Sequence, residues 1–203
     1  MQRMTDERDS IRGAGTRSVP DHIGSAQCTA AGDDDKPMAI VVMGVCGSGK
    51  SVLGRELADS LEWPFVEGDD FHPPENVGKM SAGVPLDDDD RWGWLRSLAA
   101  RMDDVTSGGG SVVMACSALK RSYRDILRRP RTVFVYLDGS RDELERRLAA
   151  RTGHFMKKEM LDSQLATLEP PDDGERHLRI DAGWGLTVHE EARLVLDGLG
   201  LSS

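Results

Sequence analysis

The sequence is poor in cysteine and has no long hydrophobic run. Cys28, Cys46 and Cys116 are the only cysteines in 203 residues, and their spacing fits neither a set of disulfides nor a metal site. We therefore expect reduced thiols, as in a cytoplasmic protein. No apolar run approaches the roughly 20 residues that a membrane-spanning helix needs, so a membrane is not an expected partner. The acidic first residues include no hydrophobic stretch, so we expect no signal peptide.

Positive charge is also scarce. Lysine and arginine total 26 against 35 aspartates and glutamates, which leaves a formal net charge of −9 and a pI near 5.0. This balance argues against nucleic acid as the main partner, because the phosphate backbone binds cationic surfaces. It leaves room for a local basic pocket that binds a small anion.

The chain has the length of one domain with a sizeable core. Residues 1–37 are polar, rich in Gly, Ser and Asp, and without apolar periodicity, which predicts a disordered N-terminal extension. Within it, Gly32 to Lys36 reads either as an engineered protease site or as a native acidic linker. The folded domain is expected over residues 38–203.

Short apolar, β-branched runs alternate with amphipathic segments along this domain. Strands are predicted near 38–44, 64–69, 111–115, 132–137 and 178–180. Helices are predicted over 91–105 and 157–168, and after Ser117, Ser140 and Thr187 as possible caps. This alternation is typical of an α/β fold with a mostly parallel sheet, helices on both faces, and the site at the carboxyl ends of the strands.

The first predicted strand runs into a glycine-rich loop that fits G-x-x-x-x-G-K-[ST]. Its residues are Gly44, Val45, Cys46, Gly47, Ser48, Gly49, Lys50 and Ser51. Such a loop turns backbone N–H groups inward around phosphate oxygens, with Lys50 on the β- and γ-phosphates and the Ser51 hydroxyl on Mg²⁺. A helix with leucines four residues apart follows, as this arrangement requires. The motif predicts a nucleoside triphosphate site and leaves open both hydrolysis and transfer to a second substrate.

The stretch "EGDDFHPPENVGKM", Glu67 to Met80, has no apolar period and reads as a loop at the end of the second strand. Phosphoryl transfer to an alcohol needs a group that accepts the hydroxyl proton. Asp69 lies where that base belongs, Glu67 is expected to hold Mg²⁺ through water, and Asp70 is the weaker rival for either role. The alternative is an acidic turn exposed to water.

Neutral and cationic donors follow on three segments. They are His72, Asn76, Lys79, Arg91, Lys120, Arg121 and Arg124. Each alone reads as a surface residue, but together they suit an anionic, polyhydroxylated acceptor, because bidentate arginine matches a carboxylate. The acidic run from Asp87 to Asp90 is expected to be a solvated helix N-terminus with one aspartate as its cap.

Four ordered blocks between residues 38 and 181 resemble the gluconokinases of the shikimate-kinase and nucleoside-monophosphate-kinase-like group of P-loop kinases. They are "GVCGSGKS", "EGDDFHPPENVGKMSAGVPLDDDDRWGWL", "ACSALKRSYRDILR" and "RTGHFMKKEMLDSQLATLEPP". The resemblance implies a three-layer P-loop kinase fold with a central five-stranded parallel sheet and a short lid. It also implies ATP-dependent phosphorylation of D-gluconate at its 6-hydroxyl, and commonly a homodimer.

The resemblance assigns roles to individual residues. Lys50 and Asp69 would be catalytic, with Arg147 and Arg151 as lid arginines that clamp the moving phosphoryl group. The gluconate contacts would be His72, Lys79, Arg91, Arg124 and Gln164, and the Mg²⁺ residues Ser51 and Glu67. For the two lid arginines, an exposed helix face paired with nearby glutamates is the alternative.

The segment "DAGWGLTVHEE" departs from the family pattern near the expected adenine site, so Trp184 either stacks on the base or fills a gap. Two rival functions remain. One is a kinase for another small acid, such as shikimate, or for a nucleotide. The other is a nucleotide-binding regulator with little turnover.

Overall fold

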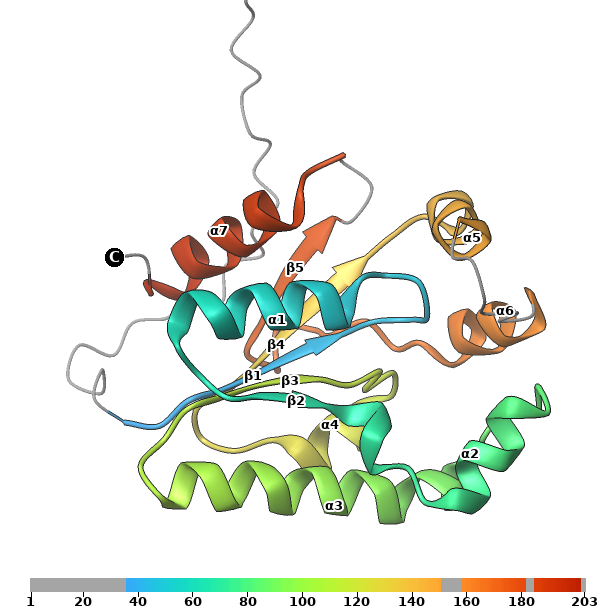
Figure 1. The fold of residues 1–203 in the computed structure, drawn as a ribbon, viewed down its shortest axis with the longest axis horizontal. Helices are drawn as coiled ribbons and strands as arrows, with labels where there is room; N and C mark the ends of the chain where they lie inside the picture. Colours follow the sequence, from blue (N-terminus) through green and yellow to red (C-terminus); the bar gives the residue numbers. More distant parts are fainter. Residues whose placement is uncertain (1–35, 151–157, 182–184, 202–203) are drawn as a thin grey trace, which may run out of the picture.

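The computed structural model describes residues 36–150, 158–181 and 185–201. Nearly all of the expected N-terminal extension, Arg151 with the expected lid segment, and Trp184 lie outside these ranges. Within them the chain forms an α/β fold with three layers, as Figure 1 shows. None of the helices in the described part of the chain is long and apolar enough to cross a membrane.

Five parallel strands form one sheet in the order β2-β3-β1-β4-β5. The strands are β1 (Ala39–Met43), β2 (Phe65–Glu67), β3 (Val112–Ala115), β4 (Thr132–Asp138) and β5 (His177–Asp181). The predicted five-stranded parallel sheet is confirmed. Every residue of β1 and β3 is buried, because helices cover both faces and continuous apolar runs are then favoured over alternation.

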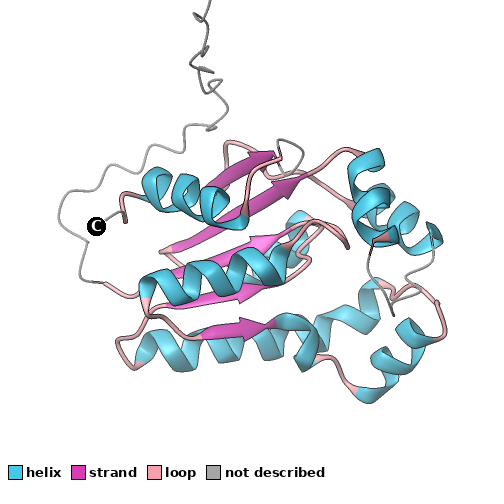
Figure 2. Ribbon diagram, turned by 45° about the horizontal axis from the view of Figure 1, so that its top comes forward, coloured by secondary structure: helices cyan, strands magenta, loops and turns pink. Residues whose placement is uncertain are grey.

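Helices α1 (Lys50–Leu61) and α7 (Val188–Leu199) pack on one face of the sheet. Helices α3 (Asp88–Ser107) and α4 (Arg121–Leu127) pack on the other. Alternate residues of β1 feed the two layers, with Ile40 in the first core and Val41 in the second. The remaining helices, α2 (Pro74–Ser81), α5 (Arg141–Ala149) and α6 (Lys158–Thr167), lie beyond the strand arrowheads (Figure 2).

The stretch predicted as a loop, Glu67 to Met80, is mostly helical. A 3₁₀ turn covers Gly68–Phe71, and α2 begins at Pro74, a position where the missing N–H of proline costs nothing. The prediction was wrong because α2 buries an amide rather than an apolar stripe. Asn76 is its one buried residue, and its Nδ2 donates to Asp90 O at 2.7 Å.

Helix caps follow the sequence at most positions. Asp87 and Asp90 form a reciprocal capping box at α3, and Thr187 and Glu190 form another at α7. Ser140 caps α5 through Glu143 N. Ser117 does not cap α4, contrary to expectation, because a turn intervenes and the helix begins only at Arg121.

Candidate active site

The phosphate loop joins the carboxyl end of β1 to the N-terminus of α1. Gly47 has a φ of 81°, and a Cβ there would come within 2.9 Å of the Leu148 side chain, so only glycine fits. The first N–H groups of α1 have no intrahelical acceptor and carry the positive end of the helix dipole. The Ser48 hydroxyl is buried without a hydrogen-bond partner among the described residues. Both features fit a cradle for phosphate oxygens.

Lys50 begins α1, and its Nζ donates to Val45 O at 3.0 Å, inside the loop. Burial lowers the pKa of Lys50, while the negative charge of Asp69 acts in the opposite direction. Lys50 therefore lies within electrostatic reach of the predicted base. The structure thus brings together the phosphate-binding cation and the carboxylate that the sequence placed on separate segments.

Helices α5 and α6 support the loop from outside. Arg147 donates through Nη1 to Ser48 O at 3.3 Å and through Nε to Glu143 Oε1 at 2.8 Å. The pairing with a nearby glutamate, one of the two alternatives above, is therefore present, and the same side chain also contacts the backbone of the phosphate loop. Gln164 accepts a hydrogen bond from Cys46 N at 2.6 Å, which places its amide oxygen on the phosphate loop rather than among the expected acceptor contacts.

The expected metal residues lie side by side. The Ser51 hydroxyl hydrogen-bonds the Glu67 carboxylate, and Arg55 Nη2 lies 3.5 Å from Glu67 Oε2. Burial raises the pKa of Glu67, and the bond from Ser51 opposes that shift. In the described ranges, no three His, Cys, Asp or Glu side chains group closely enough to hold a metal alone. One carboxylate and one hydroxyl fit Mg²⁺, which takes few protein ligands beside nucleotide phosphates and water.

Asp69 lies in the 3₁₀ turn after β2, with 75% of its side chain exposed. The turn is held close to β3, since a Cβ on Gly68 would lie 2.4 Å from Ala115 O. Trp94 Nε1 donates to Gly68 O at 2.7 Å, from the buried side of α3. The carboxylate of Asp69, the predicted base, is therefore open to solvent while the backbone beneath it is fixed.

His72 lies between Asp69 and α3. Its ring stacks on Trp94 at 4.1 Å between centroids, and its Nε2 is 4.0 Å from Asp69 Oδ1. Burial lowers the pKa of His72. The negative charge of Asp69 opposes this shift, and the positive charge of Arg91 adds to it. The pKa shift favours a neutral imidazole beside the predicted base.

The expected acceptor contacts include cations that the N-terminal turn of α3 organises. Lys79 Nζ lies 2.5 Å from Asp90 Oδ1, and Lys120 Nζ lies 2.7 Å from Asp88 Oδ1. Arg91 Nη2 donates to Leu86 O at 3.0 Å, but its Nε is buried without a partner in the described part of the chain. Arg91 thus keeps a donor that no described residue uses.

A cavity of about 480 Å³ adjoins Arg91 and Lys120. It is lined by Leu86, Asp87, Asp88, Asp89, Arg91, Lys120, Tyr123 and Thr167. Arg91 and Lys120 each lie 5.5 Å from the centroid of the Tyr123 ring. The lining offers two cations, a phenol and three carboxylates, which together can hydrogen-bond a polyhydroxylated molecule, with Arg91 and Lys120 available to an anionic group on it.

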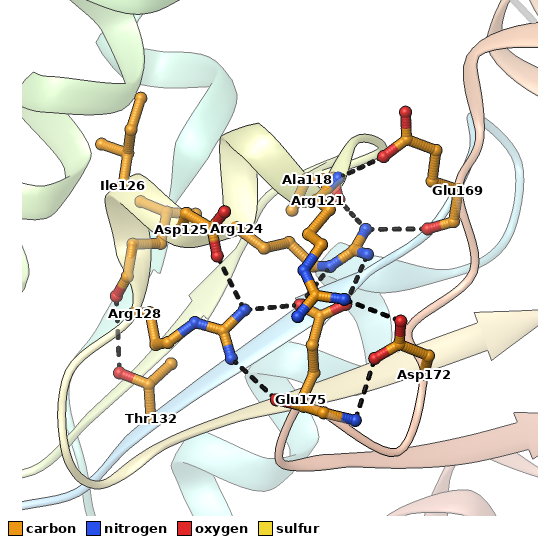
Figure 3. Close-up of polar contacts among 12 residues, drawn as sticks. Ala118, Arg121, Arg124, Asp125, Ile126, Arg128, Thr132, Glu169, Asp172 and Glu175 are labelled. Carbon is orange, nitrogen blue, oxygen red and sulfur yellow. Dashed lines mark hydrogen bonds and ion pairs between the residues drawn. The ribbon is translucent and has the colours of Figure 1, made fainter.

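Arg124, an expected gluconate contact, has a different role. Its guanidinium is 1% exposed and forms a two-pronged ion pair with Glu175, with Nε 2.8 Å from Oε1 and Nη2 2.7 Å from Oε2 (Figure 3). Its Nη1 donates to three backbone carbonyl oxygens. The expectation is corrected on physical grounds, because these nitrogens already bond to groups inside the protein. Turning them toward a substrate would take the Arg124 charge away from the buried Glu175 carboxylate.

Several partners were not foreseen from the sequence. Asp88 accepts from both Lys120 and Tyr123, and those bonds lower its pKa, although the acidic run was expected to face water. Burial would raise the pKa of Glu175, but Arg124 and Arg128 lower it overall. No local pattern marks Glu175 or Trp94, since both act through partners distant in sequence.

The phosphate loop, the Asp69 carboxylate near its lysine and the parallel sheet define a P-loop kinase. The sequence profile of the shikimate kinase family matches residues 46–170, about three fifths of the chain. The solved structure of a gluconokinase from Sinorhizobium meliloti 1021 superimposes with a TM-score of 0.73 at 48% identity, covering 81% of this chain and 92% of that one.

Two curated relatives agree. A gluconokinase from Gluconobacter oxydans is 49% identical, over 71% of this chain and 83% of its own length. A probable gluconokinase from Xenopus tropicalis is 46% identical, over 74% of this chain and 88% of its own. The chain therefore belongs to the gluconokinase family of P-loop kinases.

Proposed function

We propose that the protein transfers the γ-phosphoryl group of ATP to the 6-hydroxyl of D-gluconate, giving 6-phospho-D-gluconate and ADP. One observation carries the proposal: in a chain of the gluconokinase family, Asp69 lies within electrostatic reach of Lys50 in the phosphate loop and 4.0 Å from His72, whose pKa Arg91 of the cavity also influences. Gluconate offers the carboxylate and the hydroxyls that this cavity suits. The expected homodimer and cytoplasmic location belong to the same proposal and rest on the sequence.

In this reaction the 6-hydroxyl oxygen forms a bond to the γ-phosphorus while the bond to the β,γ-bridging oxygen breaks. Asp69 accepts the hydroxyl proton, and ADP leaves with the bridging oxygen. Lys50 and the loop amides neutralise the charge on the phosphate oxygens, and Arg147 adds a cation on the α5 side. Ser51 and Glu67 would hold Mg²⁺, which supplies further charge neutralisation when bound.

On the acceptor side, Arg91 is the residue best suited to the gluconate carboxylate. Its Nε has no partner in the described ranges, whereas Lys79 and Lys120 already pair with aspartates. Neutral His72, next to the base, can donate to or accept from a substrate hydroxyl. This division places the charged end of the acceptor at α3 and its reacting hydroxyl at Asp69.

Purified protein incubated with ATP and Mg²⁺ should release ADP when gluconate is added. A panel of gluconate, shikimate, other sugar acids and nucleoside monophosphates, followed by coupled ADP detection, measures the preference. Turnover of shikimate or a nucleotide without gluconate turnover would overturn the proposal. No acceptor-dependent ADP release would favour the low-turnover regulator.

Replacing Arg91 with Ala should raise KM for gluconate while leaving the affinity for ATP unchanged. Loss of one charge-assisted hydrogen bond costs about 1.5–3 kcal/mol, which is roughly tenfold to a hundredfold in kcat/KM. Arg96→Ala is the matched control, because Arg96 lies on the same helix and is exposed. Equal effects of both substitutions, or a weakened ATP affinity in Arg91→Ala, would contradict this assignment.

A further inference from the structure

The turn between β3 and α4, residues 116–120, carries an unfavourable backbone conformation. Ala118 has a φ of 44°, in the left-handed region that residues with a Cβ rarely adopt, and it is fully buried. Such a conformation persists only where surrounding contacts hold it. The contacts that do so here converge on Arg124.

Arg124 reaches back from α4 to the carbonyl oxygens of this turn. Its Nη1 lies 3.1 Å from Ala118 O and 3.2 Å from Leu119 O, and it also donates to Glu169 O at 2.8 Å. Glu175, itself 1% exposed, holds the other edge of the guanidinium with both oxygens (Figure 3). A bidentate carboxylate fixes the plane of the guanidinium, so Glu175 aims Nη1 at the turn.

The same turn touches both halves of the site. Ser117 O accepts from Gly44 N at 3.3 Å, at the start of the phosphate loop. The Leu119 side chain packs in one buried cluster with Val45 and Cys46 of that loop. At the end of the turn, Lys120 lines the acceptor cavity beside Asp88.

We propose that Arg124 and Glu175 are positioning residues that act through the left-handed turn at Ala118, aligning the phosphate loop and Lys120. The effect on gluconate turnover rests on the proposed function, whereas the effect on nucleotide affinity does not. Arg124 touches neither substrate in this scheme. It holds carbonyl oxygens, and the turn transmits their position to the site.

The test compares Arg124→Lys, Arg128→Gln and Ala118→Gly. Lysine keeps a positive charge beside Glu175 but cannot hold the carboxylate and the carbonyl oxygens together. Arg128 is the matched control, because it also pairs with Glu175, while its other side-chain partners among the described residues are Asp125 and the Gly174 carbonyl oxygen. Glycine at 118 adopts a positive φ without a steric cost and so needs the clamp less.

Arg124→Lys should weaken binding of a non-hydrolysable ATP analogue by about threefold or more, and should lower kcat/KM for gluconate by about tenfold. Arg128→Gln should leave the analogue affinity and kcat/KM within about twofold of the parent values. Adding Ala118→Gly to Arg124→Lys should recover at least about threefold in both the analogue affinity and kcat/KM. Ala118→Gly alone should leave both quantities near the parent values and raise Tm. Measurements are made well below each variant's Tm, checked by circular dichroism.

Three results would overturn the proposal. A lower Tm with unchanged analogue affinity would make the pair purely structural. A raised KM for gluconate with unchanged analogue affinity would make Arg124 a direct acceptor ligand. Absence of any recovery with Ala118→Gly would show that Arg124 acts other than through the turn. If gluconate is not turned over by the parent protein, the analogue affinities still decide the point.

Discussion

The Asp69→Asn variant should lose at least about a hundredfold in kcat while its affinity for ATP is retained. Asparagine keeps the shape of the side chain and some hydrogen bonding, but it cannot accept the hydroxyl proton. General-base assistance contributes about 10²–10⁴ in rate, and a loose phosphoryl-transfer transition state uses the lower part of that range. Steady-state kinetics with gluconate and titration of an ATP analogue measure the two quantities.

The neighbouring carboxylate is the control for this substitution. Asp70 lies in the same exposed 3₁₀ turn, yet the charge that opposes the pKa shifts of both Lys50 and His72 is that of Asp69. The kcat of the Asp70→Asn variant should therefore fall by less than about tenfold. If Asp70→Asn were the crippled variant and Asp69→Asn nearly normal, the base would be assigned to the wrong residue.

The Lys50→Met variant should lose about 10²–10³ in kcat, because it removes a fixed positive charge from the oxygens on which negative charge builds up. Methionine fills a similar volume without a charge, so the phosphate loop should keep its packing. The Val45 carbonyl oxygen loses one donor but keeps Ser48 N at 3.3 Å, which predicts only a small fall in Tm. Single-turnover kinetics at saturating ATP separate the loss in the chemical step from weaker binding.

Arg55→Met is the matched control, because it also removes one cation near the phosphate loop. Arg55 lies on α1 one turn beyond Lys50, and its exposed side chain pairs with Glu67 at 3.5 Å. Its removal should change kcat by less than about threefold. A comparable fall in both variants would mean that general positive potential, rather than the placement of Lys50, drives the rate.

The parts of the fold that depend on local pattern could be predicted from the sequence. Strands β1 and β4 are continuous apolar runs, and the phosphate loop is marked by its own glycines and Lys50, so neighbouring residues suffice to find them. The stretch Glu67 to Met80 was misjudged because α2 is anchored by an amide, Asn76, instead of an apolar stripe. A hydrophobic period cannot reveal a helix of that kind.

Side-chain roles depended on distant partners. Arg124 carries the same charge and lies in the same basic motif as a true acceptor ligand would. Its partner Glu175 lies 51 positions further along, on a loop that no periodicity connects to α4. The donors on Arg91 and Arg124 differ only in which acceptors the folded chain supplies, and the sequence alone does not record that difference.

The phosphate loop is continuous in sequence, but the contacts that hold it are not. Gln164 reaches the loop from 118 residues away and Arg147 from 99, and Ser117 O holds its first glycine. During synthesis, the nucleotide cradle therefore stays incomplete until α6 has left the ribosome and docked. We therefore expect ATP to stabilise the finished domain, by mass action on its folded state, rather than the nascent N-terminal half.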